Sequence, residues 1–126
     1  MRTTARFVLC FVVSLIIMPG ALAQKRGAQD VSIAGIYGDF TVGKGSGDLE
    51  GMRVWILSAG NAYHAVVQIA EGGAEDPQPN FVPVTVKGTS VEFSVGEQKF
   101  AGTITAAGLR LKGKGLLKRQ PCSDFF

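Results

Sequence analysis

The sequence predicts an all-β protein, an antiparallel up-and-down meander that closes into a small barrel of seven or eight strands behind an N-terminal signal peptide. Short runs of alternating apolar and polar residues follow one another along the chain. Gly, Pro or Asn turns separate these runs at intervals of about 8–12 residues, which is typical of antiparallel sandwiches and barrels. No helical period of useful length appears after the leader.

The first 23 residues have the three parts of a secretory signal peptide. Arg2 and Arg6 give a charged start, an apolar run covers Phe7–Met18, and Ala21-Leu22-Ala23 is an A-x-A cleavage site. The apolar run is shorter than the roughly 20 residues that a membrane-spanning helix needs. We therefore expect an exported protein, periplasmic or extracellular, whose mature form has no transmembrane segment.

Removal of the leader changes the net charge and the cysteine content of the mature chain. Without Arg2 and Arg6, Lys+Arg falls from 13 to 11 against 10 acidic residues, so the net charge falls from +3 to +1. This balance gives little support to a nucleic-acid partner. Cys10 leaves with the leader, so Cys122 is either an incidental exposed thiol or the link of a disulfide-bonded dimer.

The predicted domain organisation follows from the position of the runs. Residues 24–30 are expected to form a flexible N-terminal segment, residues 31–117 the β-barrel domain, and residues 118–126 a C-terminal tail. Each run has one apolar and one polar row, which suits an antiparallel sheet with one buried face. The runs are Ile36–Val42, Met52–Leu57, Ala62–Ala70, Phe81–Val86, Val91–Val95, Lys99–Thr105 and Leu109–Lys112.

One hairpin can be analysed in detail by parity. If Gly60-Asn61 is a two-residue turn of type I′ or II′, Leu57 pairs with His64. A four-residue loop would instead pair Trp55 with His64, and either loop keeps the same two rows together. One row is apolar throughout and must face the core. The other row holds Arg53, Trp55, Leu57, His64, Val66 and Gln68.

This second row has two interpretations. It faces water as an ordinary outer surface, or Arg53, Trp55, His64 and Gln68 line a groove for a small ligand. In the groove, Trp55 would supply a stacking surface, Arg53 a cation, and the other two hydrogen-bonding side chains.

Two further observations bear on function: a basic stripe near the C-terminus and the scarcity of catalytic residues. Arg110, Lys112 and Lys114 share one row and form a candidate for binding an anionic surface, although the simpler interpretation is a strand whose positive residues protect a sheet edge. His64 is the only histidine, and no G-x-S-x-G elbow is present. One His and one mature Cys do not make a typical zinc site. We therefore expect no enzyme activity, no metal and no cofactor.

The triplet Gly35-Ile36-Tyr37 and the later segment "FAGTITAAGLRLKG" resemble parts of the calycins, the group of lipocalin-like and avidin-like barrels. The triplet is similar to the G-x-W that opens many calycins, with Tyr37 in place of Trp. No ligand-contacting residue can be carried over. The resemblance implies a barrel whose mouth holds small ligands.

Two functions are therefore expected. The first is an exported, non-catalytic barrel that binds a small apolar or amphipathic ligand. The alternative is a cell-envelope protein-interaction or inhibitor module without a ligand cavity. The interior of the barrel distinguishes them, because a barrel this small can be filled by its own side chains.

Overall fold

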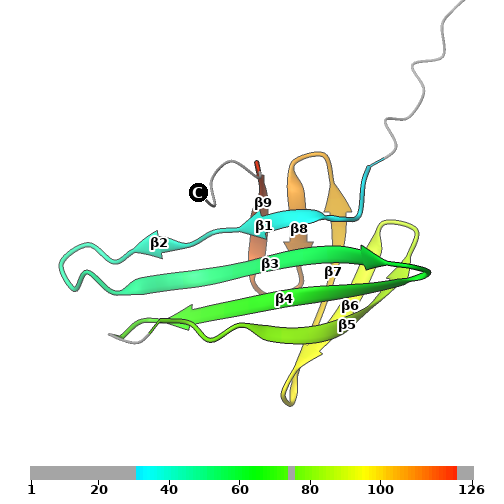
Figure 1. The fold of residues 1–126 in the computed structure, drawn as a ribbon. Coiled ribbons are helices and arrows are strands. Elements are labelled where there is room, and N and C mark those ends of the chain that lie inside the picture. Colours follow the sequence, from blue (N-terminus) through cyan, green and yellow to red (C-terminus); the bar gives the residue numbers. More distant parts are fainter. Residues whose placement is uncertain (1–30, 74–75, 122–126) are drawn as a thin grey trace, which may run out of the picture.

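The computed structural model describes residues 31–73 and 76–121, and these residues form nine β-strands and no helix (Figure 1). The strands are β1 (Gly35–Gly38), β2 (Thr41–Val42), β3 (Leu49–Ala59), β4 (Ala62–Glu71), β5 (Asn80–Lys87), β6 (Ser90–Val95), β7 (Gln98–Thr105), β8 (Gly108–Leu111) and β9 (Gly115–Gln120). The predicted signal peptide (residues 1–23), the segment 24–30 and Cys122 lie outside the described residues.

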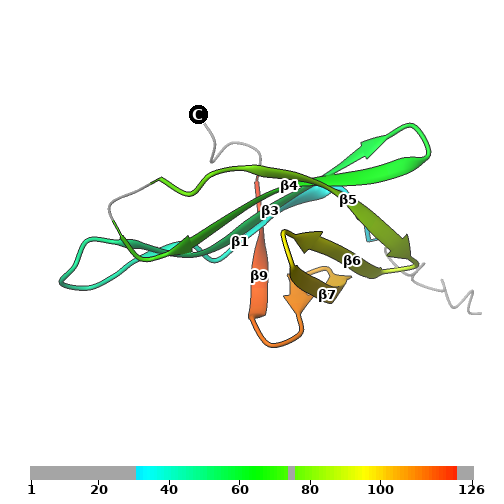
Figure 2. The same ribbon diagram turned by 90° about the horizontal axis from the view of Figure 1, so that it is seen from below.

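The strands form a closed antiparallel barrel, which confirms the predicted fold class. Their order in the sheet is β1-β9-β8-β7-β6-β5-β4-β3-β2, and a further pairing between β1 and β3 closes the circle. Eight strands therefore make the barrel, and β2 is an extra strand on the edge of β3. Figure 2 shows β3 and β4 in one long layer, with β6, β7 and β9 lying across it.

The hairpin between β3 and β4 has the two-residue turn that the sequence predicts. Ala59 pairs with Ala62 and Leu57 with His64. Gly60 has φ of 61°, whereas Asn61 has no positive φ. A type I′ turn needs positive φ at both central residues and a type II′ turn only at the first, so these angles indicate type II′. Because register and parity are linked, this turn also decides which side chains face the core.

The barrel interior is filled by apolar side chains from every strand except β2. Val54, Ala65, Val67, Leu109 and Leu117 have no exposed area. A side chain with no exposed area touches neither solvent nor an internal space wide enough for a water molecule. Phe93 and Phe100 stack beside them with ring centroids 5.2 Å apart. The middle of the barrel is therefore a packed core and not a ligand chamber.

The wall has a discontinuity between β5 and β6. Lys87 and Ser90 flank a two-residue turn and form the first of three residue pairs between β5 and β6. The last of these pairs joins Thr85 to Glu92. Hydrogen-bonded pairs alternate along an antiparallel ladder, so the next such pair would join Pro83 to Ser94. Proline has no N–H to donate, and the ladder ends. Farther along, β5 pairs only with β4.

Strand β9 differs from the expectation that the barrel ends at residue 117. It runs from Gly115 to Gln120 and pairs with both β8 and β1, so it closes the barrel. The sequence here lacks a clear apolar alternation because Arg119 occupies an inward position, opposite Tyr37. The expected run Ile36–Val42 also differs, since it divides into β1 and β2.

Arg119 fastens the end of the barrel at which β1 begins. Its guanidinium donates hydrogen bonds to the Tyr37 hydroxyl (2.8 Å) and to the carbonyls of Ser32 (2.5 Å) and Ala34 (3.3 Å). It also lies over the Tyr37 ring, 5.0 Å from the centroid. Burial raises the pKa of the Tyr37 hydroxyl, and the nearby Arg119 charge partly offsets this rise. One side chain thus joins β9, β1 and the segment before β1.

Removal of this contact should destabilise the barrel. We expect Arg119→Ala to lower the free energy of unfolding by about 2–3 kcal/mol, because the hydrogen bonds of a charged group are lost and the Tyr37 hydroxyl stays buried. The neighbouring exposed Lys118, changed to Ala, is the matched control and should alter it by no more than about 0.5 kcal/mol. Urea denaturation measures both values, and equal effects of the two variants would contradict this role of Arg119.

Candidate functional site

The predicted row on β3 and β4 lies on the outer face of the barrel. In register, Arg53 pairs with Gln68, Trp55 with Val66, and Leu57 with His64. The opposite row, with Val54 and Val67, faces the core. The structure therefore places Arg53, Trp55, His64 and Gln68 on one face, as the parity predicts, but on a convex wall outside the packed interior.

The two polar members of this row contact neighbouring loops. The Arg53 guanidinium lies over the Phe40 ring, 4.9 Å from its centroid. Gln68 Nε2 donates a hydrogen bond to the Pro77 carbonyl at 3.1 Å. These contacts fasten the segment after β1 and the β4–β5 connection to the sheet. Both side chains therefore have a structural role in the described chain.

His64 stacks on Phe81, a residue of β5 that was not among the predicted site residues. Their ring centroids are 5.0 Å apart and the planes differ by 4°. His64 Nδ1 is buried and has no hydrogen-bond partner among the described residues. A histidine base in a catalytic triad is oriented by a carboxylate at this nitrogen. In this geometry His64 contributes an aromatic ring that stacks on Phe81.

Together these residues form an apolar surface across three strands, which we call the outer apolar patch. It consists of Trp55, Leu57, His64, Val66 and Phe81. Trp55 is 43% and Phe81 66% exposed, and Val66 lies between them in the register. The described residues include three exposed large hydrophobic side chains, and two of them belong to this patch. Such clustering marks an interaction surface more often than single exposed residues do.

The charged side chains on the rows that carry the outer apolar patch are basic. On the outward rows of β3 from residue 53, of β4 up to residue 68 and of β5 from residue 81, the ionisable side chains are Arg53, His64 and Lys87. No carboxylate occurs on these rows. The surface is therefore apolar at its centre with Arg53 at one edge, and the nearest carboxylate across the β5 edge is Glu92 of β6, opposite Thr85.

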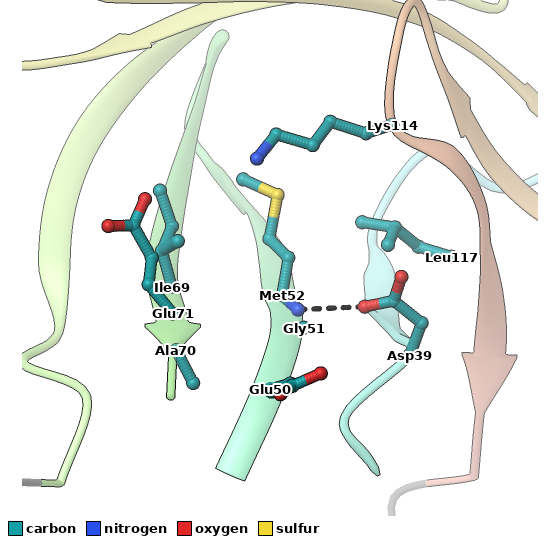
Figure 3. A pocket seen from close by; sticks show the side chains of 9 residues that line it. All are labelled: Asp39, Glu50, Gly51, Met52, Ile69, Ala70, Glu71, Lys114 and Leu117. Atoms are coloured by element: carbon teal, nitrogen blue, oxygen red, sulfur yellow. Dashed lines mark hydrogen bonds between the residues drawn. The ribbon is translucent and has the colours of Figure 1, made fainter. Parts of the chain in front are cut away.

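A shallow pocket of about 290 Å³, which we call the mouth pocket, lies between the end of β1, the paired ends of β3 and β4, and the turn before β9 (Figure 3). Its floor is apolar, with Met52, Ile69 and Leu117. Its rim is charged and contains Asp39, Glu50, Glu71 and Lys114. Glu50 and Glu71 are directly opposite each other in the β3–β4 register.

The rim depends on a close approach between the end of β1 and β3. The Asp39 carboxylate accepts a hydrogen bond from the Met52 N–H at 2.7 Å, and the Asp39 N–H donates to the Met52 carbonyl at 3.1 Å. Gly51 makes this approach possible, because a Cβ there would lie 2.8 Å from the Asp39 carbonyl oxygen. Its φ of 116° also favours glycine.

The three members of the basic stripe lie apart. Arg110 is exposed on the outer face of β8, opposite Thr103 and Leu116. β8 ends at Leu111, so Lys112 and Lys114 belong to the turn before β9. Lys114 extends over the mouth pocket toward Met52 (Figure 3). The structure therefore divides the stripe between the wall and the pocket rim.

Comparisons with known proteins identify no relative of this chain. No protein-family model matches the chain, and neither a curated protein nor a solved structure matches it significantly. The resemblance to calycins thus stays a prediction. Within residues 31–73 and 76–121, no helix is long and apolar enough to cross a membrane. The same residues contain no group of three or more His, Cys, Asp or Glu side chains that could hold a metal ion.

Two residues that matter for the outer wall were not singled out from the sequence. Phe81 joins the outer apolar patch only through the β4–β5 register, which a long loop separates from the analysed hairpin. Pro83 had a usable signal, because proline inside an apolar run indicates a strand edge or a break in pairing.

The role of Gly51 can be separated from ordinary backbone strain. We expect Gly51→Ala to lower the free energy of unfolding by about 2–4 kcal/mol, because the Cβ adds a clash with Asp39 to an unfavourable φ. Gly45 is the matched control, since its φ is 106° and a Cβ there meets nothing within 4 Å. Gly45→Ala should therefore cost only about 1–2 kcal/mol. If chemical denaturation gives the same loss of unfolding free energy for both variants, the close approach of Gly51 to Asp39 does not contribute to stability.

Proposed function

We propose that this chain is an exported, non-catalytic protein-interaction module that binds a partner protein through the outer apolar patch. The single observation that carries the proposal is the combination of a filled interior with exposed aromatic side chains on one outer face. Trp55 and Phe81 are large side chains held on a rigid sheet, and such aromatic anchors commonly dominate binding energy at protein interfaces.

The filled interior argues against a ligand held along the barrel axis. Val54, Ala65 and Leu109 have no exposed area, so an axial ligand would have to displace core side chains. The alternative of an interaction module without a ligand cavity therefore has more support than the first expectation.

Charge narrows the chemistry of the partner. The patch is bordered by Arg53, next to Trp55 on the outward row of β3, and has no carboxylate on its rows. A complementary surface is apolar at its centre and carries Asp or Glu at its edge. The signal-like pattern of residues 1–23 supports export, so the proposed partner is another protein of the periplasm, the cell envelope or the extracellular space.

Site-specific photo-crosslinking in the native host tests this proposal. A p-benzoylphenylalanine at position 81 should give one defined cross-linked product with a partner protein, because this position projects from the patch. The same probe at position 103, which is exposed on β7 in another part of the wall, is the matched control and should give no such product. No product at position 81, the same product at both positions, or a product that contains only two copies of this chain would refute the proposal.

Binding of the identified partner should depend on Phe81. We expect Phe81→Ser to weaken the affinity about thirtyfold, as loss of a central aromatic anchor does. The free energy of unfolding should fall by no more than about 1–2 kcal/mol, because the side chain is largely exposed and only its stacking on His64 and its strand preference are lost. Calorimetric titration with purified partner measures the affinity, and Thr103→Ser should leave it unchanged.

A further inference from the structure

The discontinuity between β5 and β6 opens a cleft of about 580 Å³ in the barrel wall. Pro83 and Thr85 of β5 form one side, and Glu92, Phe93 and Ser94 of β6 form the other. The cleft lies beside the outer apolar patch but is lined by different residues. Its volume is within the range of roughly 300–1,000 Å³ that small-molecule sites occupy.

Pro83 is the physical origin of this cleft. The β5–β6 ladder stops after Thr85 and Glu92, and the missing pair is Pro83 with Ser94. An N–H at position 83 would continue the ladder and bring the two strands together. The missing donor leaves the Ser94 carbonyl without this partner on the open side of β6, since β7 pairs along the other side of this strand.

The cleft combines an apolar floor with an unequal distribution of charge. The floor includes Phe93 and Phe100, whose rings stack and are each 5% exposed, and the Pro83 ring adds an apolar side. Glu92 lies at the closed end, on the last rung of the ladder opposite Thr85. Lys99 lies at the open end, opposite Ser94.

We propose that this cleft is a binding site for a small amphipathic anion, which goes beyond the proposed protein interaction. A flat apolar ring system would contact Pro83, Phe93 and Phe100. Its carboxylate or sulfonate would lie at the open end, where the Lys99 ammonium supplies a positive charge. Glu92 lies only two residues from Ser94 along β6, about 7 Å, so the anion would lie on the Lys99 side of Ser94, away from this carboxylate.

Fluorescence titration with 8-anilino-1-naphthalenesulfonate, an aromatic anion of the proposed class, tests the site. The full mature chain should bind it saturably with one molecule per chain. Lys99→Gln should lower the affinity about three- to fivefold at low salt, as expected for one exposed ion pair. Glu92→Gln is the matched charge control and should not weaken binding. Equal loss in both variants would overturn the placement of the anion.

Two variants that close or fill the cleft make the test independent of charge. Pro83→Thr restores the N–H, so the ladder should extend, the melting temperature should not fall, and the affinity should drop about tenfold or more. Ala101→Trp fills the cleft from β7 and should have the same effect even if Pro83→Thr does not fold. Thr103→Trp, two residues along β7 and outside the lining, is its control.

The outcome also distinguishes this site from the outer apolar patch. If the folded Pro83→Thr protein and Ala101→Trp bind the probe like the unaltered chain, the cleft is not the site. If Phe81→Ser alone abolishes the fluorescence, the probe lies on the outer apolar patch and the cleft proposal fails, whereas the protein-interaction proposal does not. A chain that binds no probe at all also overturns the cleft.

Discussion

The close packing of inward side chains in a small eight-stranded barrel determines most other features of this protein. Each strand of the barrel contributes alternate residues to the interior, and at this circumference those residues meet in the middle. Tyr37, Ile56 and Ile104, for example, are almost completely buried. Since the interior is occupied, recognition has to use the outer wall, the open end or a break in the wall.

The barrel wall is held together by different contacts at different places. A charged side chain, Arg119, takes an inward position and donates hydrogen bonds to the carbonyl oxygens of Ser32 and Ala34. After the last residue of β1, Asp39 connects β1 to β3 through the backbone of Met52. Between β5 and β6 nothing equivalent exists, because Pro83 cannot donate a hydrogen bond there. The β5–β6 pairing therefore ends because proline lacks a backbone N–H.

Much of this architecture could be predicted from the sequence, because period-two alternation and turn residues are local signals. The Gly60-Asn61 turn fixed both the register of β3 with β4 and the outward position of Trp55 and His64. Strand β9 could not be recognised in this way, since Arg119 replaces an apolar residue at an inward position. The contact between His64 and Phe81 also could not be foreseen, because it depends on a register across residues 72–79, which have no periodic pattern.

The measurement that tests the packed interior most directly is the stability of Ala65→Leu. Ala65 has no exposed area, and its side chain points into the barrel from the middle of β4. In a filled core the additional methyl and methylene groups have no space, so the free energy of unfolding should fall by about 1–3 kcal/mol. An unchanged or increased free energy of unfolding would mean that the barrel has room for a larger side chain, and hence for a ligand, and would contradict the account.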